Sequence, residues 1–187
     1  SCKCIMRFKG INYNAGIDYN QCNAGRDINI QEFLTDLKWI KKMNCNSIRL
    51  YGSHNKKLLL YTKLALKKKF IVWASPRYIG KTRKQTLNLL LYLSKKLEKL
   101  RKKENLFLII GNEFSIDMKG LIPGSMQMQR AKNWTKAKKS VLDNILRDFM
   151  PKIRAVFKGK ITYAALAAEN INYDIFDYIG LNYYRHF

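Results

Sequence analysis

Residues 106–114 decide the fold class of this chain, and they read Leu106-Phe107-Leu108-Ile109-Ile110-Gly111-Asn112-Glu113-Phe114. An apolar run of strand length stops at a glycine, and an amide and a carboxylate follow it side by side. Strands that are buried on both faces of a parallel sheet read this way, and α/β barrels carry their chemistry at the carboxyl ends of such strands. Because short apolar runs are ambiguous, a solvated loop at Asn112 and Glu113 is the alternative until the rest of the chain is considered.

Strand-like and helix-like segments alternate along the whole chain. Apolar positions that recur at helical spacing predict helices at about 27–43, 53–66, 82–102 and 136–157. Asp27 is a candidate N-cap for the first helix, and Pro151 is expected to kink or restart the last one. Residues 114–135, which contain Gly120, Pro123 and Gly124, are typical of a loop. Strands are expected at 7–14, 47–51, 70–75, 106–112, 161–165 and 178–184.

Six strands separated by helices indicate repeated βαβ units and a parallel sheet. Each strand also ends in side chains suited to a polar ligand, which is typical of the top face of a (β/α)8 barrel. We therefore expect an α/β fold of the parallel (β/α)8 TIM-barrel type. About six of the eight βα units would be present, and residues 1–187 would form a single, C-terminally incomplete domain. The strand-end residues are Tyr13, Asn14, Arg49, Tyr51, Trp73, Ser75, Asn112, Glu113, Tyr163, Asn182 and Tyr183.

The charge of the chain bounds its partners. There are 36 Lys and Arg residues against 13 Asp and Glu residues among 187, which gives a net charge of +23. Such a charge attracts polyanions and makes a nucleic-acid partner an option. The basic residues fall in short runs on the polar faces of helices, such as Lys67-Lys68-Lys69, so solvated helix surfaces are the simpler interpretation. No nucleotide-binding fingerprint occurs, and no cofactor is expected.

The cysteines and the apolar runs bear on metals and on localisation. Cys2 and Cys4 invite a metal interpretation, but no second cysteine pair or nearby histidine completes such a site. Free thiols at these positions and at Cys22 and Cys45 are expected instead, with no metal. No apolar run reaches membrane-spanning length, and no secretory pattern stands at the start. A cytoplasmic protein without a membrane partner is the expectation.

Taken together, the strand ends resemble those of clan A glycoside hydrolases. The likeness rests on Gly10-Ile11-Asn12-Tyr13, on Arg49, on Gly111-Asn112-Glu113, and on Asp177-Tyr178-Ile179-Gly180 with Tyr183. Several blocks also resemble bacterial proteins labelled "abortive infection protein", which are themselves glycosidase-like barrels. These blocks are residues 45–49, 118–124, 156–165 and 173–177, so the likeness extends over nearly the whole chain.

This resemblance implies a role for the pair that ends the fourth strand. In clan A enzymes the Asn-Glu pair supplies the general acid/base and a hydrogen bond to the sugar 2-hydroxyl. Glu113 would therefore be the acid/base, and Asn112 would be its neighbouring sugar ligand. Cleavage of a glycosidic bond needs a carboxylic acid that is protonated near neutral pH, and a partly desolvated barrel mouth favours that state.

The resemblance implies binding roles for four further residues. Arg49 would orient the second catalytic carboxylate and keep it ionised. Tyr13, Trp73 and Tyr183 would stack on the sugar or hydrogen-bond to it. For each aromatic residue the alternative is packing in the core.

The second carboxylate is the point of departure from the family. A retaining mechanism needs it about 5–5.5 Å from the acid/base, and the family places it at the end of the seventh strand. A (β/α)8 barrel takes about 250 residues, so about 60 are missing here. Glu169 and Asp117 are the only substitutes near the top face, and Asp117 is expected on a surface loop. The chain is expected to be a fragment or a split barrel completed by a C-terminal half-barrel chain, with a degenerate copy as the third explanation.

Two functions follow from these observations. The first is a glycoside hydrolase-like protein that hydrolyses O-glycosyl bonds of a carbohydrate by the retaining two-carboxylate mechanism, with its nucleophile missing from this chain. This chain alone would then be inactive. The second is a catalytically inactive barrel in phage defence that binds carbohydrate or nucleic acid, motivated by the charge of +23 and the missing nucleophile.

Overall fold

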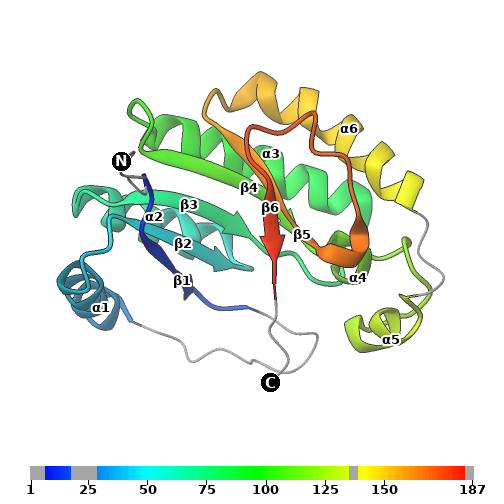
Figure 1. Cartoon of the computed structure of the whole chain (residues 1–187), viewed down its shortest axis with the longest axis horizontal. Coiled ribbons are helices and arrows are strands. Elements are labelled where there is room, and N and C mark those ends of the chain that lie inside the picture. Colours follow the sequence, from blue (N-terminus) through cyan, green and yellow to red (C-terminus); the bar gives the residue numbers. More distant parts are fainter. Residues whose placement is uncertain (1–6, 18–28, 135–138, 184–187) are drawn as a thin grey trace, which may run out of the picture.

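Six parallel strands, connected by helices, form the framework of the protein in this computed structural model (Figure 1). The structure describes residues 7–17, 29–134 and 139–183. The strands pair in chain order, each parallel to the next, and the sheet curls into half of a barrel. They are β1 (Gly10–Asn14), β2 (Ser47–Gly52), β3 (Ile71–Pro76), β4 (Leu106–Asn112), β5 (Ile161–Leu166) and β6 (Gly180–Asn182). The prediction of a parallel (β/α)8-type fold with about six of its eight units is confirmed.

Four long helices cover the outer face of the sheet, and shorter ones lie beyond the end of β4. The long helices are α1 (Ile30–Lys42), α2 (Asn55–Lys67), α3 (Arg83–Leu100) and α6 (Lys139–Val156). Residues 114–135 were predicted to form a loop, and this was wrong, since they contain α4 (Phe114–Asp117) and α5 (Gln127–Lys132). A single 3-10 turn, η2 (Ala167–Glu169), follows β5.

Two details of the helices differ from the predictions. Asp27 lies outside the described residues, and the N-cap of α1 is Asn29, whose side chain accepts a hydrogen bond from the backbone N–H of Glu32. The Glu32 side chain returns the contact to the backbone N–H of Asn29, which completes a capping box. Helix α6 runs without interruption across Pro151 and therefore does not restart there.

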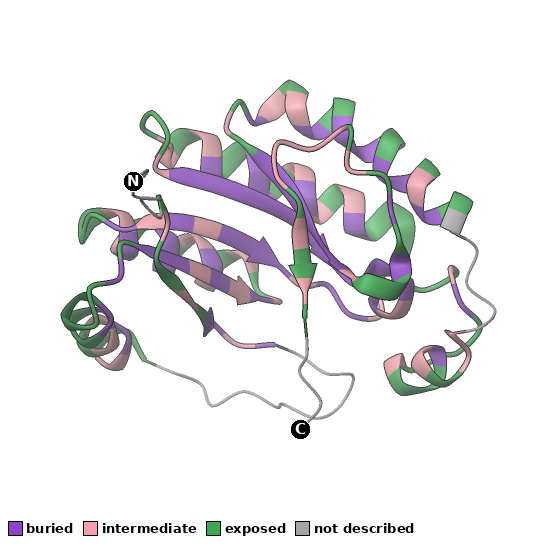
Figure 2. Ribbon diagram, in the orientation of Figure 1, coloured by how far each residue is buried: buried purple, intermediate pink, exposed green. Residues whose placement is uncertain are grey.

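The main core lies between the outer face of the sheet and the helices. Alternate strand residues point outward into it, as the two-residue period of a strand requires. Strand β4 is buried along its whole length, as the purple ribbon in Figure 2 shows. Its neighbours on both sides and the helices behind it explain why its sequence is apolar at nearly every position. The strand residues in this core include Ile48, Leu50, Val72, Ala74, Leu106, Leu108, Ile110, Ile161 and Ala165.

The inner face of the half-barrel holds the intervening residues. At the end where the strands begin, four rings pack edge to face or tilted, with centroids 4.5–6.3 Å apart: Phe8, Trp73, Phe107 and Tyr178. Toward the carboxyl ends of the strands the inner face becomes polar. The two outermost strands of the sheet, β1 and β6, each pair with one neighbour only among the described residues.

In the described part of the chain, no helix is both long enough and apolar enough to cross a membrane. The described residues also contain no group of three or more His, Cys, Asp or Glu side chains arranged to hold a metal ion. Cys45 is a buried free thiol, whereas Cys2, Cys4 and Cys22 lie outside the described residues.

Candidate active site

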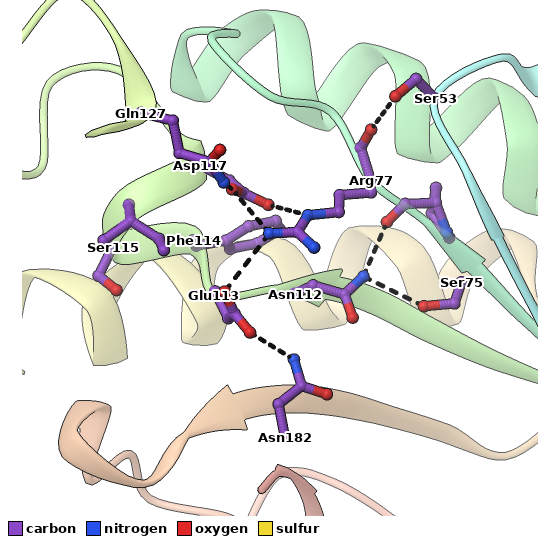
Figure 3. Close-up of polar contacts among 12 residues, drawn as sticks. Ser53, Ser75, Arg77, Asn112, Glu113, Phe114, Ser115, Asp117, Gln127 and Asn182 are labelled. Atoms are coloured by element: carbon purple, nitrogen blue, oxygen red, sulfur yellow. Dashed lines mark hydrogen bonds and ion pairs between the residues drawn. The ribbon is translucent and has the colours of Figure 1, made fainter. Parts of the chain in front are cut away.

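The candidate site forms where β4 ends, because the backbone there brings two successive side chains to one place. In a regular strand Asn112 and Glu113 would point to opposite faces. The pairing of β4 with β5 is irregular between Ile109 and Asn112, and Glu113 adopts a left-handed conformation (φ 45°, ψ 47°) as it opens α4. This conformation costs a non-glycine residue about 1–2 kcal/mol. Both polar groups consequently join one cluster at the carboxyl ends of the strands (Figure 3).

Asn112 is held by partners from two strands, β2 and β3. Its Nδ2 donates to Ser75 Oγ at 3.1 Å and to the carbonyl oxygen of Pro76 at 3.3 Å. Its Oδ1 accepts a hydrogen bond from Nη2 of Arg49, whose Nε also donates to Ser75 Oγ at 3.3 Å. The amide of Asn112 is therefore oriented by its surroundings, and the structure places the predicted pair Arg49 and Asn112 in direct contact.

Glu113 is 4% exposed, and its two carboxylate oxygens have different partners. Oε1 accepts a 2.8 Å hydrogen bond from Nδ2 of Asn182 in β6, and Oε2 lies 3.4 Å from Nη2 of Arg77. Oδ1 of Asn182 accepts a 3.1 Å hydrogen bond from Nη1 of Arg49. Asn182 thus bridges Arg49 and Glu113, and it ties the last strand to the centre of the cluster.

Arg77 was not among the predicted site residues, although it directly follows β3. Its main chain is fixed by hydrogen bonds to the loop after β2, from its N–H to the Gly52 carbonyl and from Ser53 Oγ to its own carbonyl. Its Nε lies 2.8 Å from Oδ2 of Asp117, and its Nη2 lies 3.3 Å from Oδ1. A charged residue immediately after a strand that carries other site residues was the available signal.

Asp117 was expected on a surface loop, and this was wrong. It is 1% exposed, and the side chains of Arg77, Gln127 and Arg130 contact it. Burial raises the pKa of Asp117 to about 6; the positive charge of Arg77 acts against this, and the negative charge of Glu113 adds to it. The side-chain amide of Gln127, from α5, also donates a hydrogen bond to this carboxylate.

A hollow of about 450 Å³ opens in front of this cluster. Arg49, Arg77 and Asn112 contribute to its wall, as does Asn182. Tyr183, which was predicted to bind substrate, lines the same hollow and is 81% exposed. Asn12, Tyr51 and Leu181 complete the lining. The hollow is thus bordered by β1, β2, β4 and β6, with the neighbours of Glu113 at its wall.

Tyr13 does not belong to this site, and its predicted role is corrected. The residue before it, Asn12, pairs with Arg49 and faces the hollow, so Tyr13 must face the opposite side of β1. Its hydroxyl donates a 2.7 Å hydrogen bond to Asp36 of α1, and its ring packs against Phe33. Burial and the hydrogen bond to Asp36 raise the pKa of the Tyr13 hydroxyl.

Trp73 faces the interior of the half-barrel but does not join the polar cluster. Its Nε1 donates a 3.0 Å hydrogen bond to Ser47 Oγ, and its ring packs against Phe8, Phe107 and Tyr178. It lines a second hollow of about 350 Å³, between β1 and β6, which Arg49 also borders. In this structure Trp73 therefore packs against other aromatic side chains, which was the alternative to sugar binding.

Glu169 and Tyr163 contact the start of α4 and do not line the hollow. One oxygen of Glu169 accepts hydrogen bonds from the backbone N–H and the hydroxyl of Ser115, and the other accepts one from the N–H of Leu166. The hydroxyl of Tyr163 accepts a hydrogen bond from the N–H of Phe114 and lies 3.0 Å from Glu169. Burial raises the pKa of Glu169. These groups satisfy the first N–H groups of α4 and so fix the helix that begins at Glu113.

The arrangement combines a buried carboxyl group, oriented amides and two guanidinium groups at the mouth of a parallel half-barrel. The same fold occurs in solved glycoside hydrolases. A GH113 β-1,4-mannanase matches 91% of this chain and 60% of its own, with a TM-score of 0.55 and 11% identity. A β-glucuronidase from Parabacteroides merdae matches 91% of this chain and 19% of its own, with a TM-score of 0.54 and 16% identity.

The chain has a glycoside-hydrolase-like barrel fold. It spans three-fifths of the length of the mannanase and about a fifth of the length of the glucuronidase. At these identities the likeness concerns the fold and not the residues of the site. No protein-family model and no curated protein sequence matches the chain.

Proposed function

We propose that the protein is the acid/base-bearing part of a glycoside hydrolase-like barrel, and that Glu113 is the general acid/base. The observation that supports this most directly is the position of Glu113. It is a buried carboxyl group at the carboxyl end of a central strand, with two oriented amides beside it. In such a site Glu113 donates a proton to the leaving oxygen of a glycosidic bond, and Asn112 contacts the sugar hydroxyl next to the reacting carbon.

Hydrolysis with retention also needs a nucleophilic carboxylate about 5–5.5 Å from the acid/base. Asp117 is unsuited to this task because two nitrogens of Arg77 and the amide of Gln127 bind its oxygens. Glu169 is equally unsuited, since its oxygens bind Ser115 and Leu166 behind α4. We infer that the nucleophile belongs to further βα units, which would place it across the hollow beside Arg49.

The open edge of β6 supports a partner of this kind. Ile179, Leu181 and Tyr183 stand at alternate positions and are 72%, 57% and 81% exposed. Alternate positions of a strand share one face, and Ile179 and Leu181 line the hollow between β1 and β6. A C-terminal half-barrel that pairs with β6 and β1 would cover these side chains and supply the second carboxylate. We also propose that the chain is related to the abortive infection proteins that it resembles, and that residues 1–187 form a single, C-terminally incomplete barrel domain.

Sugar binding can be tested without turnover. The side-chain amide signals of Asn112 and Asn182 would be followed by NMR while β-1,4-mannobiose or a phenyl β-glycoside is added. Both signals are expected to shift together, since both amides flank Glu113 at the hollow. The side chain of Asn88, which is exposed on α3, is the control and is expected to stay in place. Asn112 and Asn182 signals that stay unchanged with both β-1,4-mannobiose and the phenyl β-glycoside would contradict the proposal.

The charge of +23 supports a second candidate, a non-catalytic barrel that binds nucleic acid. Binding of this kind weakens steeply as salt rises, because the released counterions drive it. Polynucleotide binding that falls by orders of magnitude between low and physiological salt, combined with no response to glycosides, would favour this candidate over the first. Weak, salt-insensitive polynucleotide binding would argue against it.

A further inference from the structure

Two buried carboxylates share one guanidinium group in this protein (Figure 3). Arg77 uses Nε and Nη2 on Asp117, at 2.8 and 3.3 Å. The same Nη2 reaches Glu113 at 3.4 Å, which is a longer contact. Asp117 therefore makes the closer contacts with the guanidinium, although Glu113 is the proposed general acid.

One helical turn produces this arrangement. Glu113 and Asp117 are four residues apart, and the N–H of Asp117 donates to the carbonyl of Glu113 at 2.9 Å. Residues at this spacing lie on the same face of a helix. On the other side of Glu113 and Asp117, the loop after β3 carries Arg77. The main chain of Arg77 is anchored there, and its side chain contacts both carboxylates.

The remaining groups around Asp117 leave Arg77 as its main counter-charge. Gln127 contributes a neutral amide to its carboxylate. The buried guanidinium of Arg130 adds positive charge nearby, but it donates its hydrogen bonds to backbone carbonyls, including that of Asp117. Tyr163 lies behind, from β5, as a neutral hydroxyl. The charge that Arg77 presents to Glu113 consequently depends on how its guanidinium is divided between the two acids.

We propose that Asp117 is a positioning residue that takes the larger share of Arg77 and so reduces the charge that Arg77 presents to Glu113. A general acid beside an arginine is held as an anion, because the cation favours the ionised form. With Asp117 ionised, the guanidinium pairs mainly with Asp117, and less of its positive charge acts on Glu113. Without that charge, Glu113 is left as the carboxylate that pairs with Arg77. The acid role of Glu113 in this statement rests on the proposed function, whereas the division of Arg77 between the two carboxylates does not.

The pairing of Arg77 with Asp117 can be measured on the protein without any substrate. The Nε–H signal of Arg77, assigned by its loss in Arg77→Lys, would be followed by ¹H–¹⁵N NMR from about pH 5 to about pH 8. Because the pKa of Asp117 is raised to about 6, the signal is expected to move with a midpoint near that pH. In Asp117→Asn this movement is expected to disappear.

Glu113→Gln is the matched control, since it removes the other carboxylate. The negative charge of Glu113 raises the pKa of Asp117, so this variant is expected to keep the transition and to shift its midpoint to lower pH. A wild-type signal that does not move with pH would overturn the proposal, as would a transition lost in Glu113→Gln but kept in Asp117→Asn. The wild-type and Glu113→Gln titrations decide the question even if Asp117→Asn does not fold. Neither titration depends on glycoside turnover, so both results would stay the same if the proposed function were wrong.

Discussion

Asn182 Nδ2 donates a 2.8 Å hydrogen bond to Glu113 Oε1, and this contact joins the last strand of the sheet to the end of the fourth. The same side chain accepts from Arg49, so it separates a cation from an acid that would otherwise attract each other. Replacement by Ala removes both hydrogen bonds. We expect Asn182→Ala to lower the free energy of unfolding by about 1–2 kcal/mol, since each bond involves a charged group.

Urea denaturation of Asn182→Ala beside Asn88→Ala tests this expectation. Asn88 is exposed on α3, where alanine is a better helix former, so that variant is expected to be neutral or slightly more stable. Equal stability of the two variants would show that Asn182 does not tie β6 to the site.

Gly111 is required by the ring of Phe114. A Cβ at position 111 would lie well inside contact distance of that ring, which is buried and packs against Tyr163 and Phe149. Gly111→Ala is expected to destabilise the protein by about 1–3 kcal/mol, as overpacked cores are. In a double-mutant cycle, Phe114→Leu is expected to recover part of this loss. Strictly additive effects of the two changes would contradict the account.

The left-handed backbone at Glu113 predicts an inverted preference between glycine and alanine. Both replacements lose the carboxylate, so their difference reports the backbone alone. Glycine adopts φ 45° without a Cβ clash, and Glu113→Gly is therefore expected to be more stable than Glu113→Ala by about 1 kcal/mol. At a right-handed helical position the order is reversed. Thermal or urea unfolding of the two variants measures it, and a more stable alanine variant would rule out the left-handed conformation.

Asp117 makes the stability of the protein depend on pH. Its pKa is raised from 3.8 to about 6, so the folded state binds this proton more tightly than the unfolded state. The resulting stabilisation is complete below about pH 4 and is lost as the pH rises through about 6, and it amounts to about 2–3 kcal/mol. Asp117→Asn does not titrate there.

The free energy of unfolding of Asp117→Asn, measured relative to wild type, is therefore expected to rise by that amount between about pH 4 and about pH 7. Asp174→Asn serves as the control, because Asp174 is an exposed carboxylate that pairs with Arg147 at the surface. A difference between Asp117→Asn and wild type that is constant with pH would refute the buried titration.

The sequence predicts those parts of the fold in which apolar residues recur at a regular spacing. The apolar run before Gly111 and the amphipathic helices around it determine the alternation of strands and helices, and the strand ends locate the cluster at Asn112 and Glu113. The face of a strand is harder to assign. Asn12 and Tyr13 are adjacent polar residues, and only the pairing of Asn12 with Arg49 decides which of them faces inward.

The structure of the connection after Glu113 could not be predicted from the local sequence. Glycine and proline in residues 118–124 suggest a loop, but tertiary contacts impose α4, whose N–H groups bind Tyr163 and Glu169 from β5 and η2. That turn of helix buries Asp117 and presents it to Arg77. Arg77, whose guanidinium the two acids share, lies 40 positions from Asp117 and 36 positions from Glu113 in the chain. No sequence period extends over such a separation.

We propose that Glu113 is a general acid whose partner nucleophile is absent from the described residues. In molar azide, an azide ion can replace that nucleophile. It attacks the anomeric carbon of a phenyl β-glycoside from the face opposite the leaving oxygen, Glu113 protonates that oxygen, and phenol and the α-glycosyl azide are released. We expect azide-dependent release of phenol by the wild type.

The decisive measurement compares this azide-dependent rate in Glu113→Gln, in Asp174→Asn and in the wild type. We expect a loss of about 100-fold or more in Glu113→Gln, as removal of a general acid brings, and a rate within about twofold of wild type in Asp174→Asn. A Glu113→Gln variant that releases phenol as fast as the wild type, or a wild type that azide does not activate, would contradict this proposal.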